Sequence, residues 1–205
     1  MMRLAILGAS GHGKVVADAA EQTGWGGIVF FDDAWPNLKT NGPWVIEGNT
    51  EVLIERVTDF DGVIVAIGNN HIRSVKQSEL VAAGGKMATI VHPSAVVSAY
   101  ASIDDGSLVF ANAVVNACAT LGAGVIINTG AVVEHDCVVG NFAHISPNAV
   151  LAGRVTLGSL AWVGACASVR QLIAVGEASV VGMGAVVTKD VISGVTVVGN
   201  PAKVV

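Results

Sequence analysis

The chain has 205 residues, of which 52% are hydrophobic and 13% are charged, and its formal net charge is −5. A chain of this length and apolar content can bury a substantial core, so intrinsic disorder is excluded. The acidic balance argues against a nucleic-acid-binding protein that relies on a basic face.

The first 86 residues are predicted to form a small Rossmann-like α/β domain, because short apolar strands alternate with helical segments. A loop with one short helix, over residues 50–56, is predicted for segment 34–59, which contains Pro36 and Pro43. The other expected elements are strands over residues 3–7, 28–31 and 62–67 and helices over residues 14–22 and 72–82.

Three candidate ligand signals follow these strands at their carboxyl ends, the edge at which open α/β sheets bind ligands. The first is a glycine-rich turn at residues 8–13, whose N–H groups would suit a phosphate. Its order is G-x-x-G-x-G, so a dinucleotide fingerprint is not met, and a plain tight turn is an equally open interpretation. The other two signals are Asp32-Asp33 and Gly68. The aspartates suit ribose hydroxyls or a base, or else form a solvated strand end.

A six-residue repeat begins at Val91 and continues without interruption to Val187. All seventeen residues at this spacing are Val, Ile or Leu, and thirteen of the sixteen residues four positions later are Ala, Ser or Cys. Strand side chains alternate between faces, so the small residue and the next aliphatic residue both point inward. Each hexad is therefore predicted to be one short strand and one bend. Three hexads close an 18-residue coil, which predicts a left-handed parallel β-helix of about five coils over residues 87–205, with a C-terminal cap.

A charge-free run from Gly106 to Val133 lies inside this repeat. Its length would suit a membrane span, but its asparagines, its glycines and its fixed apolar spacing argue against one. No signal peptide is recognisable after Arg3. The three cysteines, Cys118, Cys137 and Cys166, are odd in number and form no CxxC pair, which is typical of a reduced, cytoplasmic protein.

Two histidines lie within the repeat, and the register keeps both out of the core. His135 falls in a bend beside Asp136, and His144 takes an outward strand position, so the plainest interpretation is two exposed histidines. Gly153 lies one coil beyond His135 and would leave open backbone beside it. Ala165 and Met183 form another bend column, and Cys137 is expected to point inward.

Several segments resemble the family of nucleotide-sugar and sialic-acid acetyltransferases of the NeuD/PglD type. They are GASGHGKVV, FFDD, VAIGNN, VHPSAVVS, NTGAVVEHDCVVGNFAHISPNAVLAG and VVGNPAKVV, and they span nearly the whole chain. Within that family the chain is most similar to the UDP-4-amino-sugar N-acetyltransferases of bacillosamine synthesis. The resemblance implies an acetyl-CoA-dependent transfer of an acetyl group to the 4-amino group of a UDP-4-amino-4,6-dideoxy sugar, without a metal, by a homotrimer with active sites between neighbouring β-helices.

The resemblance also implies roles for individual residues. His135 matches the general base, and Asp136 stands where the family often has Glu, so its shorter side chain is expected to form a looser hydrogen bond. The expected acetyl-CoA contacts are His144, Gly153, Ala165 and Met183, the last at a position where Gly is usual. The expected contacts to the nucleotide sugar are Ser10, Gly11, His12, Asp32, Asp33 and Gly68. With an ordinary pKa near 6.5, a histidine can accept a proton from an attacking amine, and the Gly153 N–H is a candidate donor to the oxyanion.

Three alternatives remain open. A sialic-acid O-acetyltransferase would share the fold and the base, and its free sugar acid would make no uridine contact. A zinc enzyme would bind its metal through histidines between subunits, but only His135 and His144 are available and they form no compact pair. A non-catalytic β-helix that serves as a binding module would bind no acetyl-CoA, and it leaves the Glu134-His135-Asp136 bend without an explanation.

Overall fold

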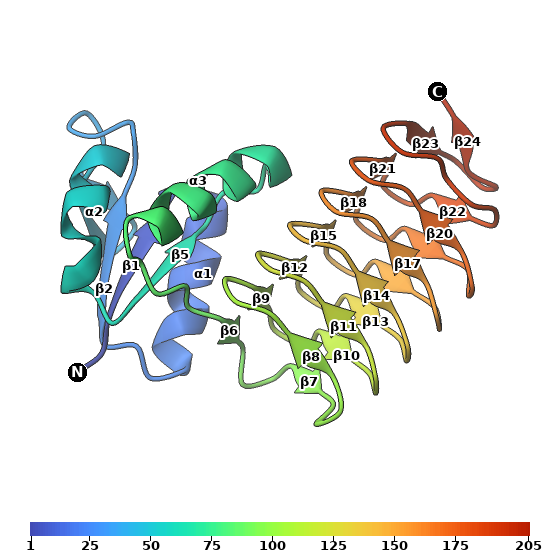
Figure 1. The fold of residues 1–205 in the computed structure, drawn as a ribbon, viewed down its shortest axis with the longest axis horizontal. Coiled ribbons are helices and arrows are strands. Elements are labelled where there is room, and N and C mark those ends of the chain that lie inside the picture. Colours follow the sequence, from blue (N-terminus) through green and yellow to red (C-terminus); the bar gives the residue numbers. More distant parts are fainter. The chain divides into compact units, whose positions relative to one another are not determined.

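The protein is described over all residues, 1–205, by a computed structural model that divides into two compact units, Met1–Ile90 and Val91–Val205 (Figure 1). The domain boundary expected after residue 86 lies four residues before the boundary between these units.

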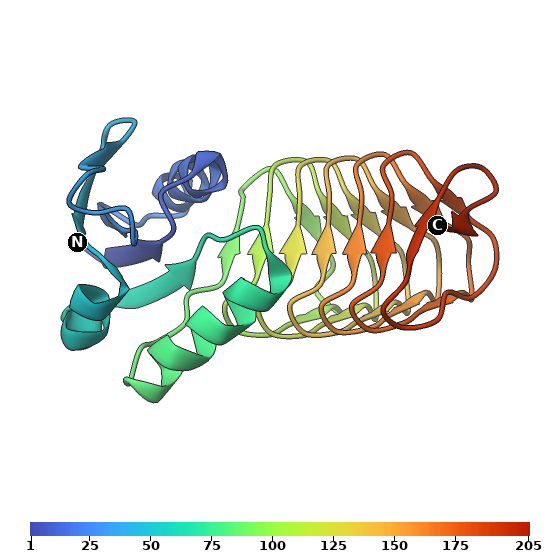
Figure 2. The same ribbon diagram turned by 90° about the horizontal axis from the view of Figure 1, so that it is seen from above.

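The N-terminal unit is a five-stranded sheet in the order β3-β4-β2-β1-β5. Neighbouring strands are parallel, except that β3 runs antiparallel to β4. Helix α1 covers one face of the sheet and helices α2 and α3 cover the other (Figure 2). The elements are β1 (Arg3–Leu7), α1 (Gly11–Gln22), β2 (Gly27–Phe31), β3 (Thr40–Asn41), β4 (Trp44–Gly48), α2 (Thr50–Arg56), the 3₁₀ turn η1 (Val57–Asp59), β5 (Gly62–Val65) and α3 (Asn70–Ala82).

The sequence-based assignment of this unit was correct for the helix over residues 50–56. Strand β5 ends two residues before the expected end and helix α3 begins two residues before the expected start, and two larger differences concern the segment 34–59 and helix α1. The segment expected to be a loop contains the hairpin β3–β4, whose turn uses Gly42 at a φ of +69°. Helix α1 begins at Gly11, three residues before the expected start. Glycine is a poor helix former, which hid this start, but the missing side chain of Gly13 lets the helix lie against the carbonyl oxygen of Gly8.

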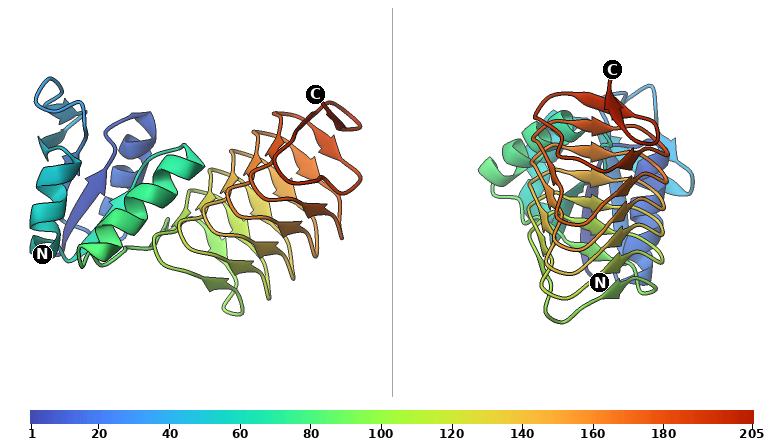
Figure 3. Two further views of the ribbon diagram at one scale, coloured as in Figure 1. Left: turned by 45° about the horizontal axis from the view of Figure 1, so that its top comes forward. Right: turned by 90° about the vertical axis from the view of Figure 1, so that its right-hand side faces the viewer.

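The C-terminal unit is a parallel β-helix, as the hexad spacing predicts (Figure 3). Its coils close through three sheets. Sheet I contains β7 (Val96–Val97), β10 (Val114–Val115), β13 (Val132–Val133), β16 (Val150–Leu151), β19 (Ser168–Val169) and β22 (Val186–Val187). Sheet II contains β8 (Ser102–Ile103), β11 (Thr120–Leu121), β14 (Val138–Val139), β17 (Thr156–Leu157) and β20 (Ala174–Val175). Sheet III contains β6 (Ile90–Val91), β9 (Leu108–Val109), β12 (Ile126–Ile127), β15 (His144–Ile145), β18 (Trp162–Val163), β21 (Val180–Val181), β23 (Thr196–Val198) and β24 (Lys203–Val204).

The core of this unit consists of the two inward positions of each hexad, and Cys137 is among the fully buried residues, as expected. Partners in neighbouring coils are 18 residues apart, as in the pairing of Val114 with Val132. The last coil is shorter, because Val175 pairs with Val191.

The bends of the β-helix share one backbone geometry. The second bend residue has a positive φ in every hexad from Gly106 (75°) to Gly184 (68°), although most of these residues are not glycine. Asp136 is one of them, with a φ of 58°. A left-handed residue turns the chain sharply at low cost only for Gly, Asn and Asp, so the closed coils must hold the others in place. We call the bends from sheet I to sheet II the I–II edge and those from sheet III to sheet I the III–I edge.

Candidate active site

A histidine and a carboxylate, His135 and Asp136, form a pair on the I–II edge between β13 and β14. The His135 Nδ1 and Asp136 Oδ2 atoms are 2.8 Å apart, and both side chains are more than half exposed. An ionised carboxylate can only accept a hydrogen bond, so His135 Nδ1 carries a proton, and in the neutral ring the lone pair is on Nε2. The expectation of a looser hydrogen bond was wrong. Asp136 reaches the ring because the bend brings the two side chains to the same side.

Gly153 lies directly beside the free nitrogen of this imidazole. A Cβ atom at residue 153 would lie 2.5 Å from His135 Nε2 and 2.7 Å from Cε1, so only glycine leaves the ring in place. The backbone of the two bends is joined by the Arg154 N–H, which donates to the His135 carbonyl oxygen at 2.9 Å. The Gly153 N–H makes no hydrogen bond within the chain. A base and a free donor therefore lie side by side on successive coils.

His144 is buried, with 8% of its surface exposed, and the expectation of an exposed histidine was wrong. It does point outward from β15, but its ring is stacked on the Trp162 indole, with centroids 5.6 Å apart and planes at 6°. Its Nε2 lies 3.1 Å from Asn128 Nδ2. The 18-residue register already places Trp162 next to His144, so this pairing was available from the sequence.

The Asn128 amide has only one orientation that satisfies its neighbours. The Thr129 N–H donates to Asn128 Oδ1 at 2.8 Å, which leaves Asn128 Nδ2 to donate to His144 Nε2. A nitrogen that accepts a hydrogen bond carries no proton, so the His144 imidazole is neutral with its proton on Nδ1.

The residues expected to contact acetyl-CoA fall into two separate places on one chain. Gly153 lies on the I–II edge with His135. Ala165 and Met183 lie on the III–I edge, where they line a hollow of about 360 Å³ together with Trp162 and other apolar residues. His144 belongs to sheet III, which faces away from the I–II edge because the three sheets close a triangle. A single chain therefore does not bring His135 and His144 together.

The N-terminal unit has a hollow of about 290 Å³ at the carboxyl ends of β1, β2 and β5. Of the six residues expected to contact a nucleotide sugar, Ser10, Asp32, Asp33 and Gly68 line it. Gly11 and His12 lie in the first turn of α1, outside the lining. Thr50, Ala66, Ile67 and Ile72 also line the hollow, and sequence reasoning missed them.

The two aspartates of the hollow, Asp32 and Asp33, differ in their hydrogen-bond partners. Asp32 accepts hydrogen bonds from the backbone N–H groups of Ala9 at 2.7 Å and Ala34 at 2.9 Å, so it holds the glycine turn in place. Asp33 accepts from the Thr50 N–H at 2.9 Å and keeps much of its side chain exposed. Partial burial would raise the pKa of Asp33, but the hydrogen bonds from Thr50 and the charge of Lys76 outweigh it and hold the pKa below its ordinary value. Asp33 is thus an ionised acceptor at the hollow.

A buried arginine supports the wall of the hollow that follows β5. Arg73 has no exposed surface, and its guanidinium donates to the carbonyl oxygens of Ile67 at 3.0 Å and Gly68 at 3.3 Å and to Asn70 Oδ1 at 2.9 Å. Burial lowers the pKa of Arg73 to about 10. Burial, together with the charge of Arg73, lowers the pKa of His12 to about 4, so His12 is neutral at pH 7.

The remaining candidate features are the Cys137 thiol, a metal site and a membrane-spanning helix. Burial raises the pKa of the Cys137 thiol, which donates to the Ala152 carbonyl oxygen, so this thiol is a poor nucleophile. No group of three or more His, Cys, Asp or Glu side chains is arranged to hold a metal ion. None of the helices has both the length and the apolar character needed to cross a membrane.

The sequence pattern of the PglD N-terminal domain matches residues 3–80. A curated relative, the UDP-N-acetylbacillosamine N-acetyltransferase of Bacillus subtilis (strain 168), is 35% identical over 115 residues. That alignment covers 54% of this chain and 52% of the relative, so it spans about half the length of each.

Several solved structures match nearly the whole chain. The acetyltransferase domain of PglB from Neisseria gonorrhoeae FA1090, in complex with acetyl coenzyme A, is 42% identical with a TM-score of 0.95, over 99% of this chain and 98% of that one. PerB from Caulobacter crescentus, in complex with CoA and GDP-perosamine, is 33% identical with a TM-score of 0.94, over 100% of this chain and 98% of that one. Both share the α/β unit and the β-helix described above.

Proposed function

This chain belongs to the PglD-type family of sugar acetyltransferases, and we propose that it transfers the acetyl group of acetyl-CoA to the 4-amino group of a UDP-4-amino-4,6-dideoxy sugar. The observation that supports this proposal most is the His135 imidazole, whose proton is held on Nδ1 by Asp136 and whose free Nε2 faces Gly153. This is the arrangement that an amine acylation needs, since the base must accept a proton while a donor stabilises the carbonyl oxygen.

The chemistry assigned to these residues follows their geometry. Acetyl-CoA supplies an activated acetyl thioester. As the bond from the amine nitrogen to the carbonyl carbon forms, His135 Nε2 accepts the proton that the nitrogen loses, and Asp136 stabilises the resulting imidazolium. The Gly153 N–H donates to the oxyanion that develops on the carbonyl oxygen. When the carbon–sulfur bond breaks, His135 returns the proton to the departing thiolate, so no covalent acyl-enzyme is required.

A second copy of the chain is needed to complete this site. The apolar hollow with Ala165 and Met183, next to the His144–Trp162 stack, suits the pantetheine arm of acetyl-CoA, yet it lies away from His135. We therefore assign the hollow of one copy to the His135 edge of a neighbouring copy, in a homotrimer with three equivalent sites.

The N-terminal hollow is assigned to the nucleotide of the sugar substrate. Its ionised Asp33 accepts hydrogen bonds from ribose hydroxyls or from the imide N–H of uracil, and the turn before α1 presents backbone N–H groups to the diphosphate. The relatives include proteins named for both UDP and GDP sugars. The experiment below therefore decides which nucleobase the hollow binds.

The test is a thiol-release assay with acetyl-CoA and a panel of UDP-, GDP- and dTDP-4-amino sugars and free sialic acid. We expect rapid release with a UDP-4-amino sugar and a loss of about 10²-fold or more in kcat for His135→Ala. His71→Ala, which removes an exposed histidine of α3, is the matched control.

Any other result of the assay would contradict a part of the proposal. Release with sialic acid alone would show an O-acetyltransferase, and release with a GDP sugar alone would overturn the uridine assignment. Near-normal turnover of His135→Ala would refute the general base. Wild-type protein that neither binds acetyl-CoA nor releases thiol would be a binding module.

A further inference from the structure

One aromatic side chain on the I–II edge has no role in the site described above. Tyr100 lies in the bend between β7 and β8, and 80% of its surface is exposed. Its N–H donates to Ser98 Oγ at 3.2 Å, which fixes the bend, but its hydroxyl makes no hydrogen bond within the chain. Covering the face of such a ring with a ligand is favourable, so an unpacked tyrosine near a reacting group is a candidate for substrate binding.

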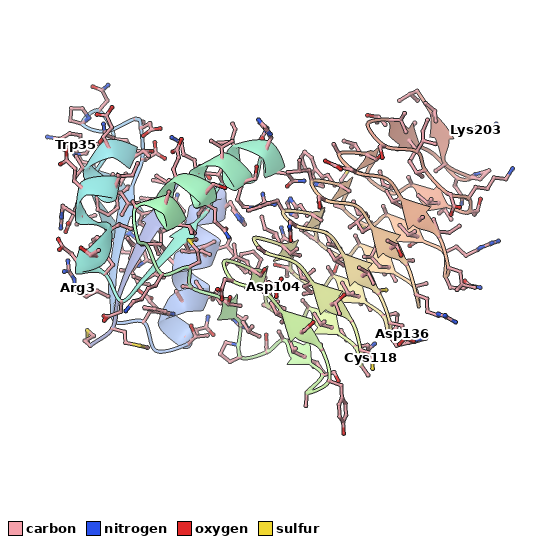
Figure 4. The ribbon with its side chains drawn as sticks, viewed as in Figure 1. Arg3, Trp35, Asp104, Cys118, Asp136 and Lys203 are labelled. Atoms are coloured by element: carbon pink, nitrogen blue, oxygen red, sulfur yellow. The ribbon has the colours of Figure 1, made fainter.

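The repeat places Tyr100 on the same edge as the proposed base. Tyr100 precedes Asp136 by 36 residues, which is two coils of 18, and Cys118 takes the same bend position on the coil between them. The Asp136 N–H donates to the Ala117 carbonyl oxygen at 3.1 Å, and Cys118 and Asp136 lie next to each other along this edge (Figure 4). Strands of neighbouring coils are about 4.8 Å apart, so the Tyr100 backbone lies about 10 Å along the edge from Asp136.

The stretch of edge between Tyr100 and His135 carries small, uncharged side chains. Its other bend residues are Ala99, Ala117 and Cys118, and no Lys or Arg precedes His135 within the repeat. A hexopyranose with its ring substituents is about 6 Å across by standard bond lengths, so one sugar ring fits along this stretch. Because the stretch has no cation, it suits an uncharged group rather than a phosphate.

The two reactants of the proposed transfer have to approach His135 from different sides. The acetyl carbonyl oxygen is assigned to the Gly153 N–H, one coil on the C-terminal side, so the acyl donor takes that side of the imidazole. The acceptor is left with the N-terminal side, where Tyr100 lies. The hexose is the part of the acceptor that carries the reacting amine, and its C–H groups and C6 methyl group form an apolar surface that matches an aromatic face.

We propose that Tyr100 is a substrate-binding residue, whose ring packs against the hexose of the acceptor while the 4-amino group lies at His135 Nε2. The inference rests on the proposed function, because that function places the amine at His135. The contact holds the sugar at a second point besides its amine, which limits the orientations in which the amine meets the acetyl group.

Steady-state kinetics of thiol release test the contact. Tyr100→Ala is expected to raise the KM for the UDP-4-amino sugar by about tenfold, with kcat and the KM for acetyl-CoA within about twofold of wild type. Tyr100→Phe keeps the ring and is expected to keep the acceptor KM within about twofold of wild type. Leu172→Ala is the matched control, because Leu172 is 66% exposed and follows Asp136 by the same two coils, and it leaves the acceptor KM unchanged.

Four results would overturn the assignment. An unchanged acceptor KM in Tyr100→Ala would show that the ring makes no contact. An equal rise in Tyr100→Phe would show that the hydroxyl binds and the ring does not. A rise in the KM for acetyl-CoA in place of the acceptor KM would put Tyr100 beside the acyl donor. Loss of the homotrimer in Tyr100→Ala, measured by light scattering, would make Tyr100 a contact between copies of the chain.

The Cys118 thiol provides a measurement that does not depend on acetyl transfer. Cys118 and Cys166 are exposed and Cys137 is buried, so in the Cys166→Ser variant Cys118 is the one thiol open to iodoacetamide. The UDP-4-amino sugar, added without acetyl-CoA, is expected to slow the alkylation of Cys118. Adding Tyr100→Ala to this variant should raise the sugar concentration needed for the same protection by about tenfold.

This measurement separates the inference from the proposed reaction. Protection of Cys118 without thiol release on any acceptor would overturn the reaction and support the contact. Unchanged alkylation at a sugar concentration that saturates binding in calorimetry would refute the contact and leave the reaction standing. Wild-type protein that binds none of the nucleotide sugars in the panel would overturn both.

Discussion

Replacing Gly153 with alanine tests the position of the proposed general base, His135, without changing His135 itself. The added Cβ would lie 2.5 Å from His135 Nε2, whereas ordinary contact begins at 3.4 Å, so the imidazole must shift by about 0.9 Å. A misplacement of about 1 Å at a reacting group can lower a rate by about 10²-fold. We therefore expect kcat to fall by about 10²-fold.

The backbone itself should tolerate this change. Ala117 takes the same bend position one coil before His135, and Gly153 does not have a positive φ. The assay is steady-state thiol release with saturating acetyl-CoA and acceptor, together with a thermal melt. A Tm close to that of wild type with kcat reduced about 10²-fold is the expected pair of results. A kcat within threefold of wild type would show that the ring does not act from the position seen beside Gly153.

Three further predictions concern the groups that hold the two sites in place. Asp136→Asn should lower kcat by about tenfold or more, since the amide no longer fixes the His135 proton on Nδ1, and unchanged turnover would refute this orienting role. Asp32→Asn should lower the free energy of unfolding by about 1–3 kcal/mol, because one of the two backbone N–H groups that Asp32 binds loses its acceptor. The same change should raise the KM of the nucleotide sugar. An unchanged denaturation curve and an unchanged KM would contradict this prediction. For His12, burial and the charge of Arg73 lower the pKa from 6.5 to about 4, so only the unfolded chain binds this proton as the pH falls through that window. The free energy of unfolding should fall by about 3 kcal/mol between pH 6.5 and pH 4. His12→Gln should remove that part of the pH dependence, which denaturation curves of wild type and variant measure at each pH. An equal pH dependence of the two proteins would contradict a buried neutral ring.

The β-helix could be predicted from the sequence because its constraint is local and repeated. An inward position of a narrow coil accepts only an aliphatic or a small side chain, and this rule recurs every six residues from Val91 to Val187. The same register placed His135 in a bend, Gly153 one coil beyond it and Cys137 in the core. Strands β1, β2 and β5 of the N-terminal sheet followed in the same way from short apolar runs, whereas β3 and β4 did not.

The tertiary structure alone decided how deeply those residues are buried and which roles their side chains take. The burial of His144 depends on the Trp162 indole from the next coil, and Asp32 acts as a support because the fold brings two backbone N–H groups to its carboxylate. Hairpin β3–β4 forms because β4 adds to the edge of the sheet at β2. The placement of His135 and His144 on opposite sides follows from the closure of three sheets into a triangle. A period in the sequence fixes which way each side chain points, but contacts between coils and between strands fix its environment.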